Sequence, residues 1–122
     1  MVPATRAPAA APIGLRLQWA DGVCVLAVEG ELDVATAGLL REALGALLAS
    51  GTAAVVDLAE VTFADLRGID PVLEAMADGS ARGLAVSLRN PPPSVRRIMA
   101  TIPPLAAALE AGDDLAAALG AR

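Results

Sequence analysis

The sequence of 122 residues contains no histidine, tyrosine or lysine, since all nine basic residues are arginine. These absences exclude an imidazole base, a Schiff-base amine and the lysine that P-loop sites place on phosphates. Carboxylates, hydroxyls and arginines are the polar groups that remain for chemistry. We therefore predict a protein that is not an enzyme and that uses neither a cofactor nor a metal ion.

Cysteine, aromatic residues and net positive charge are also scarce. Cys24 is the only cysteine, which excludes a disulfide framework and a Cys/His zinc site. Trp19 and Phe63 are the only aromatic residues, so the core must be aliphatic. A net charge of −5 argues against nucleic-acid binding, and the chain lacks an apolar run long enough for a membrane span. We expect a cytoplasmic protein.

The chain divides into a tail and one domain. Residues 1–12 are rich in alanine and proline, and the prolines interrupt any apolar segment of a secretion signal. We predict a disordered tail over these residues. The remaining residues, 13–122, suffice for a single domain that buries most of its apolar surface.

The domain begins with a predicted β-hairpin. Four apolar residues alternate with small or polar ones, as in a half-exposed strand: Ile13, Leu15, Leu17 and Trp19. Asp21-Gly22 then predicts a two-residue turn. Residues 23–28 are apolar on both faces, which predicts an interior strand.

The next segment predicts a crossover between two buried strands. Asp33 is placed to cap a helix over residues 34–49, with its carboxylate accepting hydrogen bonds from the amide groups of Ala35 or Thr36. Residues 52–58 form the second apolar run. Two buried strands joined by a helix indicate a parallel pair.

The second half predicts alternating helices and strands. The expected segments are a helix over 71–77 that ends at Asp78-Gly79-Ser80, a strand over 84–88, a short helix over 94–101 closed by Pro103-Pro104, a weak edge strand over 106–109, and a last helix from Gly112. This order predicts an α/β domain in which helices flank a mixed sheet of four to five strands.

Four groups of residues in this order also resemble a known family. They are Gly30-Glu31-Leu32-Asp33 with Ala35-Thr36-Ala37, Val56-Asp57-Leu58, Val61-Thr62-Phe63 with Asp65 and Gly68, and Val95-Arg96-Arg97-Ile98-Met99. Together they resemble the STAS domain of anti-sigma factor antagonists over about residues 13 to 120. The resemblance implies a STAS-like fold and a non-catalytic role in protein–protein interaction.

In that family, the loop after the third strand reads aspartate, serine, serine, glycine, and an anti-sigma kinase phosphorylates the second serine. The same positions here are Asp65, Leu66, Arg67 and Gly68. Arg67 stands at the phosphoacceptor position and cannot accept a phosphoryl group. The resemblance therefore implies a domain that binds an anti-sigma kinase or a related regulator without phosphorylation at that position. The alternative is a regulatory STAS subunit of a membrane transporter, either a lipid-transport ABC system or an anion carrier.

The resemblance implies a partner-binding surface made of Glu31, Asp33, Asp65, Leu66, Arg67, Gly68 and Asp70. One local departure from the family is Asp70-Pro71. Proline suits the first helical position and disfavours a helical residue before it. We therefore expect Asp70 to cap the helix and to shift its start to Pro71.

For some residues of this region the sequence leaves more than one interpretation open. Asp65 either contacts the partner or accepts hydrogen bonds from its own loop. Arg67 lies in solvent, faces an acidic partner or pairs with Asp65 or Asp70. Asp57 is expected to bond to neighbouring backbone, and an enzyme that uses it or Asp65 as a base lacks a nucleophile. Thr62 is expected to lie out of reach of a kinase.

Overall fold

The computed structural model describes residues 13–21 and 23–120. The predicted tail, Gly22 and the last two residues fall outside this range. The elements are β1 Ile13–Ala20, β2 Val23–Leu32, α2 Ala37–Ala49, β3 Ala53–Ala64, α3 Leu66–Arg82, β4 Val86–Arg89, α4 Pro93–Met99 and α5 Pro103–Gly120.

The sheet has the strand order β1-β2-β3-β4 in the described part of the chain. β1 pairs antiparallel with β2, while β2, β3 and β4 run parallel to one another. The hairpin after Ala20 and the crossover through α2 are both as predicted. Asp21 has a φ of 51°, the positive value that a tight hairpin turn demands. The fold is thus the predicted α/β arrangement with a mixed, four-stranded sheet.

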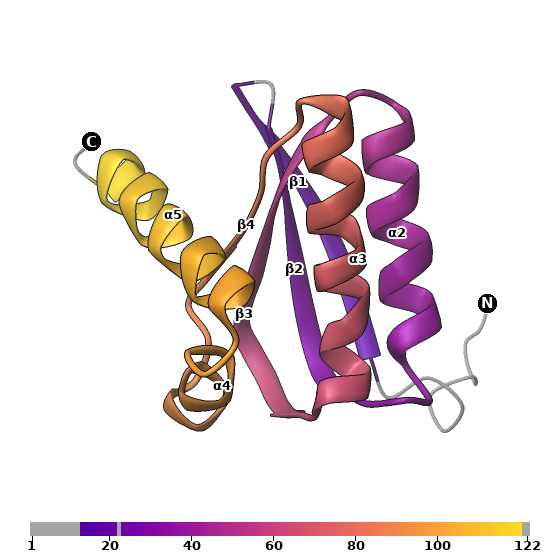
Figure 1. Cartoon of the computed structure of the whole chain (residues 1–122), viewed down its shortest axis with the longest axis vertical. Helices are drawn as coiled ribbons and strands as arrows, with labels where there is room; N and C mark the ends of the chain where they lie inside the picture. Colours follow the sequence, from indigo (N-terminus) through magenta and orange to yellow (C-terminus); the bar gives the residue numbers. More distant parts are fainter. Residues whose placement is uncertain (1–12, 22, 121–122) are drawn as a thin grey trace, which may run out of the picture.

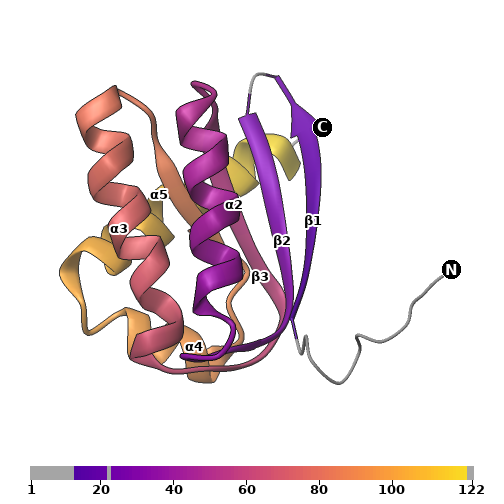
Figure 2. The same cartoon turned by 90° about the vertical axis from the view of Figure 1, so that its right-hand side faces the viewer.

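Helices α2 and α3 lie side by side and pack against the sheet, whereas α5 runs beside β4 on the other side of that strand (Figures 1 and 2). The apolar stripe of α2 is buried at Leu40, Leu44, Leu47 and Leu48, as its periodicity predicted. These leucines share one cluster with the alternate β2 residues Cys24, Leu26 and Val28. The core is aliphatic, because Trp19 and Phe63 are both exposed.

The exposure of β1 goes beyond the predicted half-exposed strand. Ile13 is buried and Leu15 is partly buried, but Leu17 and Trp19 are 53% and 60% exposed. The register places Leu17 beside Leu26 and Trp19 beside Cys24, on the core face of the sheet. They are exposed because β1 is an edge strand whose only extensive packing is with β2.

Two predictions for the C-terminal region are wrong. Residues 106–109 form no strand, and no helix starts at Gly112, because α5 spans Pro103–Gly120 without a break. Pro103 stands at the first position of this helix, where its missing N–H has no cost. The alanine-rich run after it has high helix propensity, and this favours helix over strand.

Candidate functional site

The ends of β2 and β3 and the starts of α2 and α3 meet at one end of the molecule (Figure 1). We call residues 30–36 and 61–68 the loop end. The backbone N–H of Asp65 donates to the carbonyl of Leu32 at 3.0 Å, which joins the two strand ends. The structure therefore brings together the two segments from which the predicted binding residues come.

Strand β3 is irregular as it approaches this end. Its pairing with β2 shifts register twice, between Ala27 and Glu29 and between Gly30 and Glu31. Such bulges bend a strand and redirect its side chains. Thr62 lies in the second bulge, where its hydroxyl is exposed and donates to the Gly30 carbonyl at 3.3 Å. Thr62 thus lies in β3, as expected, but its side chain is exposed to solvent.

Asp65 is the N-cap of α3. Its backbone is extended, with φ −120° and ψ 179°, and its Oδ1 accepts a hydrogen bond from the N–H of Gly68 at 2.9 Å. This arrangement satisfies one of the free amide groups of the first helical turn. The expectation that Asp65 accepts a hydrogen bond from the backbone of its own segment is therefore confirmed.

The predicted start of α3 at Pro71 is wrong. The helix begins at Leu66 and runs through Pro71, Asp78 and Gly79 to Arg82, with Gly83 as a left-handed C-cap. Pro71 lacks an N–H, so it cannot donate to the Arg67 carbonyl four residues earlier. The cap at Asp65 and the packing of Gly68 determine the start, and Asp70 lies inside the helix rather than at its cap.

Gly68 is buried against the end of β2. A Cβ at this position would lie 2.1 Å from the Leu32 carbonyl oxygen and 2.5 Å from the Asp33 nitrogen. No other residue fits without moving the strand end or the helix. The α3 and β2 backbones approach each other so closely here that the position requires glycine. Gly68 therefore allows α3 to pack against the end of β2 and presents no side chain to a partner.

Asp33 and Thr36 hold the turn between β2 and α2. The Oδ1 of Asp33 accepts from the N–H groups of Ala35 at 2.9 Å and Thr36 at 3.2 Å, as predicted. The helix itself starts later than predicted, at Ala37. Sequence reasoning missed Thr36, which is 1% exposed and whose hydroxyl donates to the Glu31 carbonyl at 2.7 Å.

Leu66 and Arg67 occupy the first turn of α3 and point to solvent. Leu66 is 56% exposed and lies at the same end as Phe63, at 49%, and Val34, at 67%. Arg67 is exposed and forms no ion pair with any described residue, so the pairing with Asp65 or Asp70 is not observed. We call Val34, Phe63 and Leu66 the apolar patch of the loop end.

Asp57 lies in the middle of β3, away from the loop end. Its Oδ1 accepts from the Ala59 N–H at 3.0 Å, as expected, and its Oδ2 accepts from Arg89 Nε at 3.2 Å. Both carboxylate oxygens are thus engaged in bonds within the fold. Among the residues that the structure describes, no three acidic or cysteine side chains gather as a metal site.

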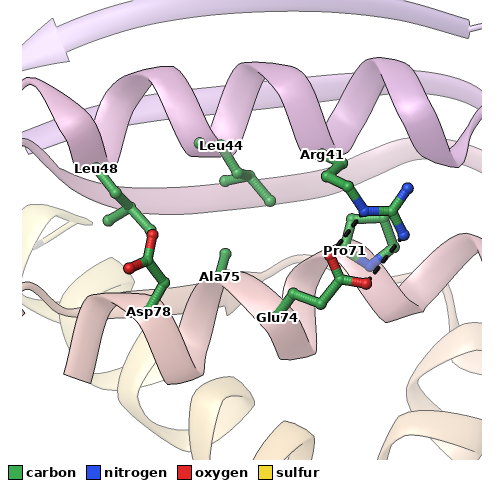
Figure 3. A pocket seen from close by; sticks show the side chains of 8 residues that line it. Arg41, Leu44, Leu48, Pro71, Glu74, Ala75 and Asp78 are labelled. Atoms are coloured by element: carbon green, nitrogen blue, oxygen red, sulfur yellow. Dashed lines mark hydrogen bonds and ion pairs between the residues drawn. The ribbon is translucent and has the colours of Figure 1, made fainter. Parts of the chain in front are cut away.

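A shallow groove of about 140 Å³ separates α2 from α3. Figure 3 shows Arg41 and Glu74 pointing toward each other across it, with Nε and Oε1 2.7 Å apart. The hydrogen bond to Glu74 raises the pKa of Arg41, and the nearby charges of Glu74 and Asp70 add to this. The same hydrogen bond lowers the pKa of Glu74. This contact ties the two helices behind the loop end.

Comparison with known proteins identifies the fold. A family profile described as "Mlab, STAS domain" matches residues 15–102. A search among curated proteins finds no match. None of the described helices combines the length and apolar character needed to cross a membrane.

Several solved structures share this architecture. The unphosphorylated anti-sigma factor antagonist SpoIIAA has a TM-score of 0.67 and 22% identity, over 79% of this chain and 85% of that one. An anti-sigma factor antagonist from Mycobacterium paratuberculosis has a TM-score of 0.61 and 29% identity, over 71% and 74%. The murine anion transporter Slc26a9 has a TM-score of 0.54 and 21% identity, over 66% of this chain and 14% of that one.

Proposed function

Because the chain belongs to the STAS domain family, we propose that it is a non-catalytic interaction domain that binds a regulatory protein through its loop end without being phosphorylated there. The partner is an anti-sigma kinase or a related regulator, as the solved anti-sigma factor antagonists of this fold suggest. A cytoplasmic location and a part in sigma-factor regulation follow from this role.

The observation that carries the proposal is the exposed pair Leu66-Arg67 at the start of α3. Position 67 is accessible, and its helical turn is capped by Asp65. An exposed, capped turn at the position that the resemblance assigns to a kinase contact supports the proposal, and this turn lacks the hydroxyl that a kinase needs. A phosphoserine carries about −1.5 to −2 charges and arginine carries +1, so Arg67 does not imitate the phosphorylated state.

Six of the seven predicted contact residues fall into two groups, and the seventh, Asp70, lies half-buried inside α3. Asp33, Asp65 and Gly68 shape the loop end through backbone contacts. Glu31, Leu66 and Arg67 have exposed side chains, which we propose make the contacts together with Phe63 and Val34. The buried centre of a protein interface is apolar and its rim is polar, and the apolar patch beside Glu31 and Arg67 has this composition.

The first test is phosphorylation by the cognate anti-sigma kinase with ATP. We expect mass spectrometry to find no phosphate at position 67 or on Thr62 of the wild-type chain. The variant Arg67→Ser places a hydroxyl on the same exposed turn with the Asp65 cap intact, and we expect it to accept phosphate. Leu66→Ser/Arg67→Ser restores both family serines. Stoichiometric phosphate at either position of the wild-type chain would show that the loop end is phosphorylated and would contradict the proposal.

The second test is binding of the regulator. Leu66→Lys places a charge in the apolar patch and should weaken binding by roughly tenfold or more, as truncating a buried interface residue does. Leu17→Lys, measured at concentrations where the chain is monomeric, is the matched control, because Leu17 is 53% exposed and lies on β1, away from the loop end. Equal loss with both variants would mean that the loop end is not the contact surface.

A second candidate is a regulatory subunit of a membrane transporter. The observation that favours it is again Arg67, because a subunit that only positions a transporter protein has no need of a phosphoacceptor. Slc26a9 shows that this fold also occurs in an anion transporter. Affinity capture with the wild-type chain and the Leu66→Lys variant separates the candidates. If the wild-type chain captures a kinase and the variant does not, the sigma-regulating role is favoured. If the wild-type chain captures an ATPase or a permease and the variant does not, the transporter role is favoured.

A further inference from the structure

β1 is a sheet edge that no other element of the described chain covers. β4, at the other edge, has four residues and lies beside α5, whereas β1 has eight. Natural proteins block an exposed edge with proline, lysine or a bulge, because its free N–H and C=O groups can pair with another chain. β1 contains none of these: it pairs with β2 over all eight residues without a register shift, and Arg16 is its only charged residue.

The side chains of this edge are also unusual for a solvent-exposed strand. Leu17 and Trp19 are two residues apart, so they point to the same face of the strand. They are 53% and 60% exposed. The register aligns them with the buried residues Leu26 and Cys24, so the core face of the sheet continues onto β1, where none of the described helices covers it.

We propose that a second copy of the chain covers this edge by an antiparallel β1–β1 ladder centred on Gln18. In this register Leu17 lies opposite Trp19 of the second copy, and the two-fold axis repeats the contact. Gln18 lies opposite Gln18 of the second copy, where each amide offers both a donor and an acceptor. The most exposed apolar side chains of β1 thus cover each other.

The charges of the strand suit this register. Arg16 lies opposite Ala20 of the second copy and next to that copy's Asp21, so opposite charges approach each other twice. Neither Arg16 nor Asp21 has an ion-pair partner in the described chain. A ladder centred on Arg16 would instead set two guanidinium groups opposite each other, which is unfavourable.

The dimer leaves the loop end free. The ladder centres on Gln18, which pairs with Val25 near the hairpin. The loop end starts at Gly30, five residues further along β2, or roughly 17 Å at 3.3 Å per residue. Each copy keeps its own partner-binding surface, so the dimer is bivalent.

Sedimentation equilibrium of the full chain tests the proposal. We expect a concentration-dependent equilibrium between one and two copies of the 12.2 kDa chain. Trp19 is the only tryptophan, so its emission should shift to the blue as the dimer forms and the indole leaves water. A chain that stays monomeric at all concentrations, or that grows beyond two copies, would overturn the closed β1–β1 dimer.

Two variants locate the interface. Leu17→Lys should raise the dimer dissociation constant by roughly tenfold or more, because the lysine would face Trp19 of the second copy at two places. Leu66→Lys changes an equally exposed leucine at the loop end and should leave dimerisation unchanged. The reverse result, in which only Leu66→Lys dissociates the dimer, would assign the interface to the loop end and contradict the proposal.

A cross-link tests the register. Gln18→Cys places two thiols opposite each other across the two-fold axis, and we expect an intermolecular disulfide on mild oxidation. The native Cys24 is buried and serves as the internal control in the wild-type chain. Arg16→Cys should cross-link much less, because its opposite residue is Ala20. Efficient cross-linking through position 16 alone would contradict the Gln18 register.

Discussion

Gly68 shows how one residue can determine the geometry of a surface to which it contributes no side chain. It stands in the first turn of α3, and its α-carbon packs directly against the backbone of Leu32 and Asp33. The Asp65 carboxylate also holds this turn, because it accepts a hydrogen bond from the Gly68 N–H. The exposed residues 66 and 67 therefore lie between Asp65 and Gly68, which are both held in place by backbone contacts.

We expect Gly68→Ala to lower the free energy of unfolding by about 1–3 kcal/mol, as overpacking of a tight site does. The added methyl group would collide with a backbone carbonyl, which cannot rotate away as a side chain can. Chemical denaturation measures the change. Gly45→Ala is the control, since it adds a methyl group in open space on α2 and should raise stability by up to about 1 kcal/mol. If Gly68→Ala and Gly45→Ala changed stability equally, Gly68 would not be tightly packed against the end of β2.

At the scale of elements, α2 and α3 act as a pair behind the loop end. Arg41 donates from Nε and Nη2 to the two carboxylate oxygens of Glu74, at 2.7 and 3.0 Å. Both side chains are about half exposed, at 48% and 54%, so the contact adds little stability and is weakened by solvent. It links the exposed sides of α2 and α3, whose buried faces pack through the apolar core.

The pH dependence of stability tests this contact. The hydrogen bond lowers the pKa of Glu74 in the folded chain, so the contact stabilises the fold above the unfolded pKa of about 4.3. That contribution is lost as the pH falls through the folded pKa. We expect the stability difference between wild type and Glu74→Gln to be present at neutral pH and to vanish in acid.

Thermal denaturation over a range of pH values measures this difference. Glu42→Gln is the control, because it removes an exposed carboxylate of α2 that has no ion pair among the described residues. A difference for Glu74→Gln that persists unchanged in acid would indicate that it arises from packing rather than from the charge of Glu74.

At the scale of the whole molecule, two groups of exposed large apolar side chains stand out among the described residues. The apolar patch lies at the loop end, and Leu17 with Trp19 lies along β1. One continuous cluster of buried apolar residues lies behind both surfaces. A domain of this kind can hold a partner at one end and a second copy along its edge.

We expect the two surfaces to be energetically independent. Leu17 and Leu66 lie on different elements, roughly 20 Å apart along β2. Their lysine variants should therefore change the unfolding free energy additively, within about 0.3–0.5 kcal/mol. Denaturation of both single variants and the double variant, at concentrations where the chain is monomeric, measures the coupling. A larger coupling would show that the surfaces communicate through the sheet.

Local sequence patterns determined most of the architecture. The alternation in β1, the turn at Asp21, the leucine stripe of α2 and the order of elements from β1 to α4 follow from patterns among near neighbours, and these were predicted. The same holds for the hydrogen bonds of Asp33 to Ala35 and Thr36. Such features depend on residues a few positions apart, so the sequence displays them directly.

The start of α3 was decided by the Asp65 cap together with a tertiary contact of Gly68. Asp70-Pro71 is a correct local signal for a helix start, yet the helix begins at Leu66 because Gly68 must meet the distant backbone of Leu32. The exposure of Leu17 and Trp19 likewise depends on which strand ends up at the sheet edge. The sequence by itself determined that position 67 carries an arginine in place of a hydroxyl. The tertiary structure decided that this arginine stands exposed on a capped helical turn, because a contact between residues more than thirty positions apart holds the helix there.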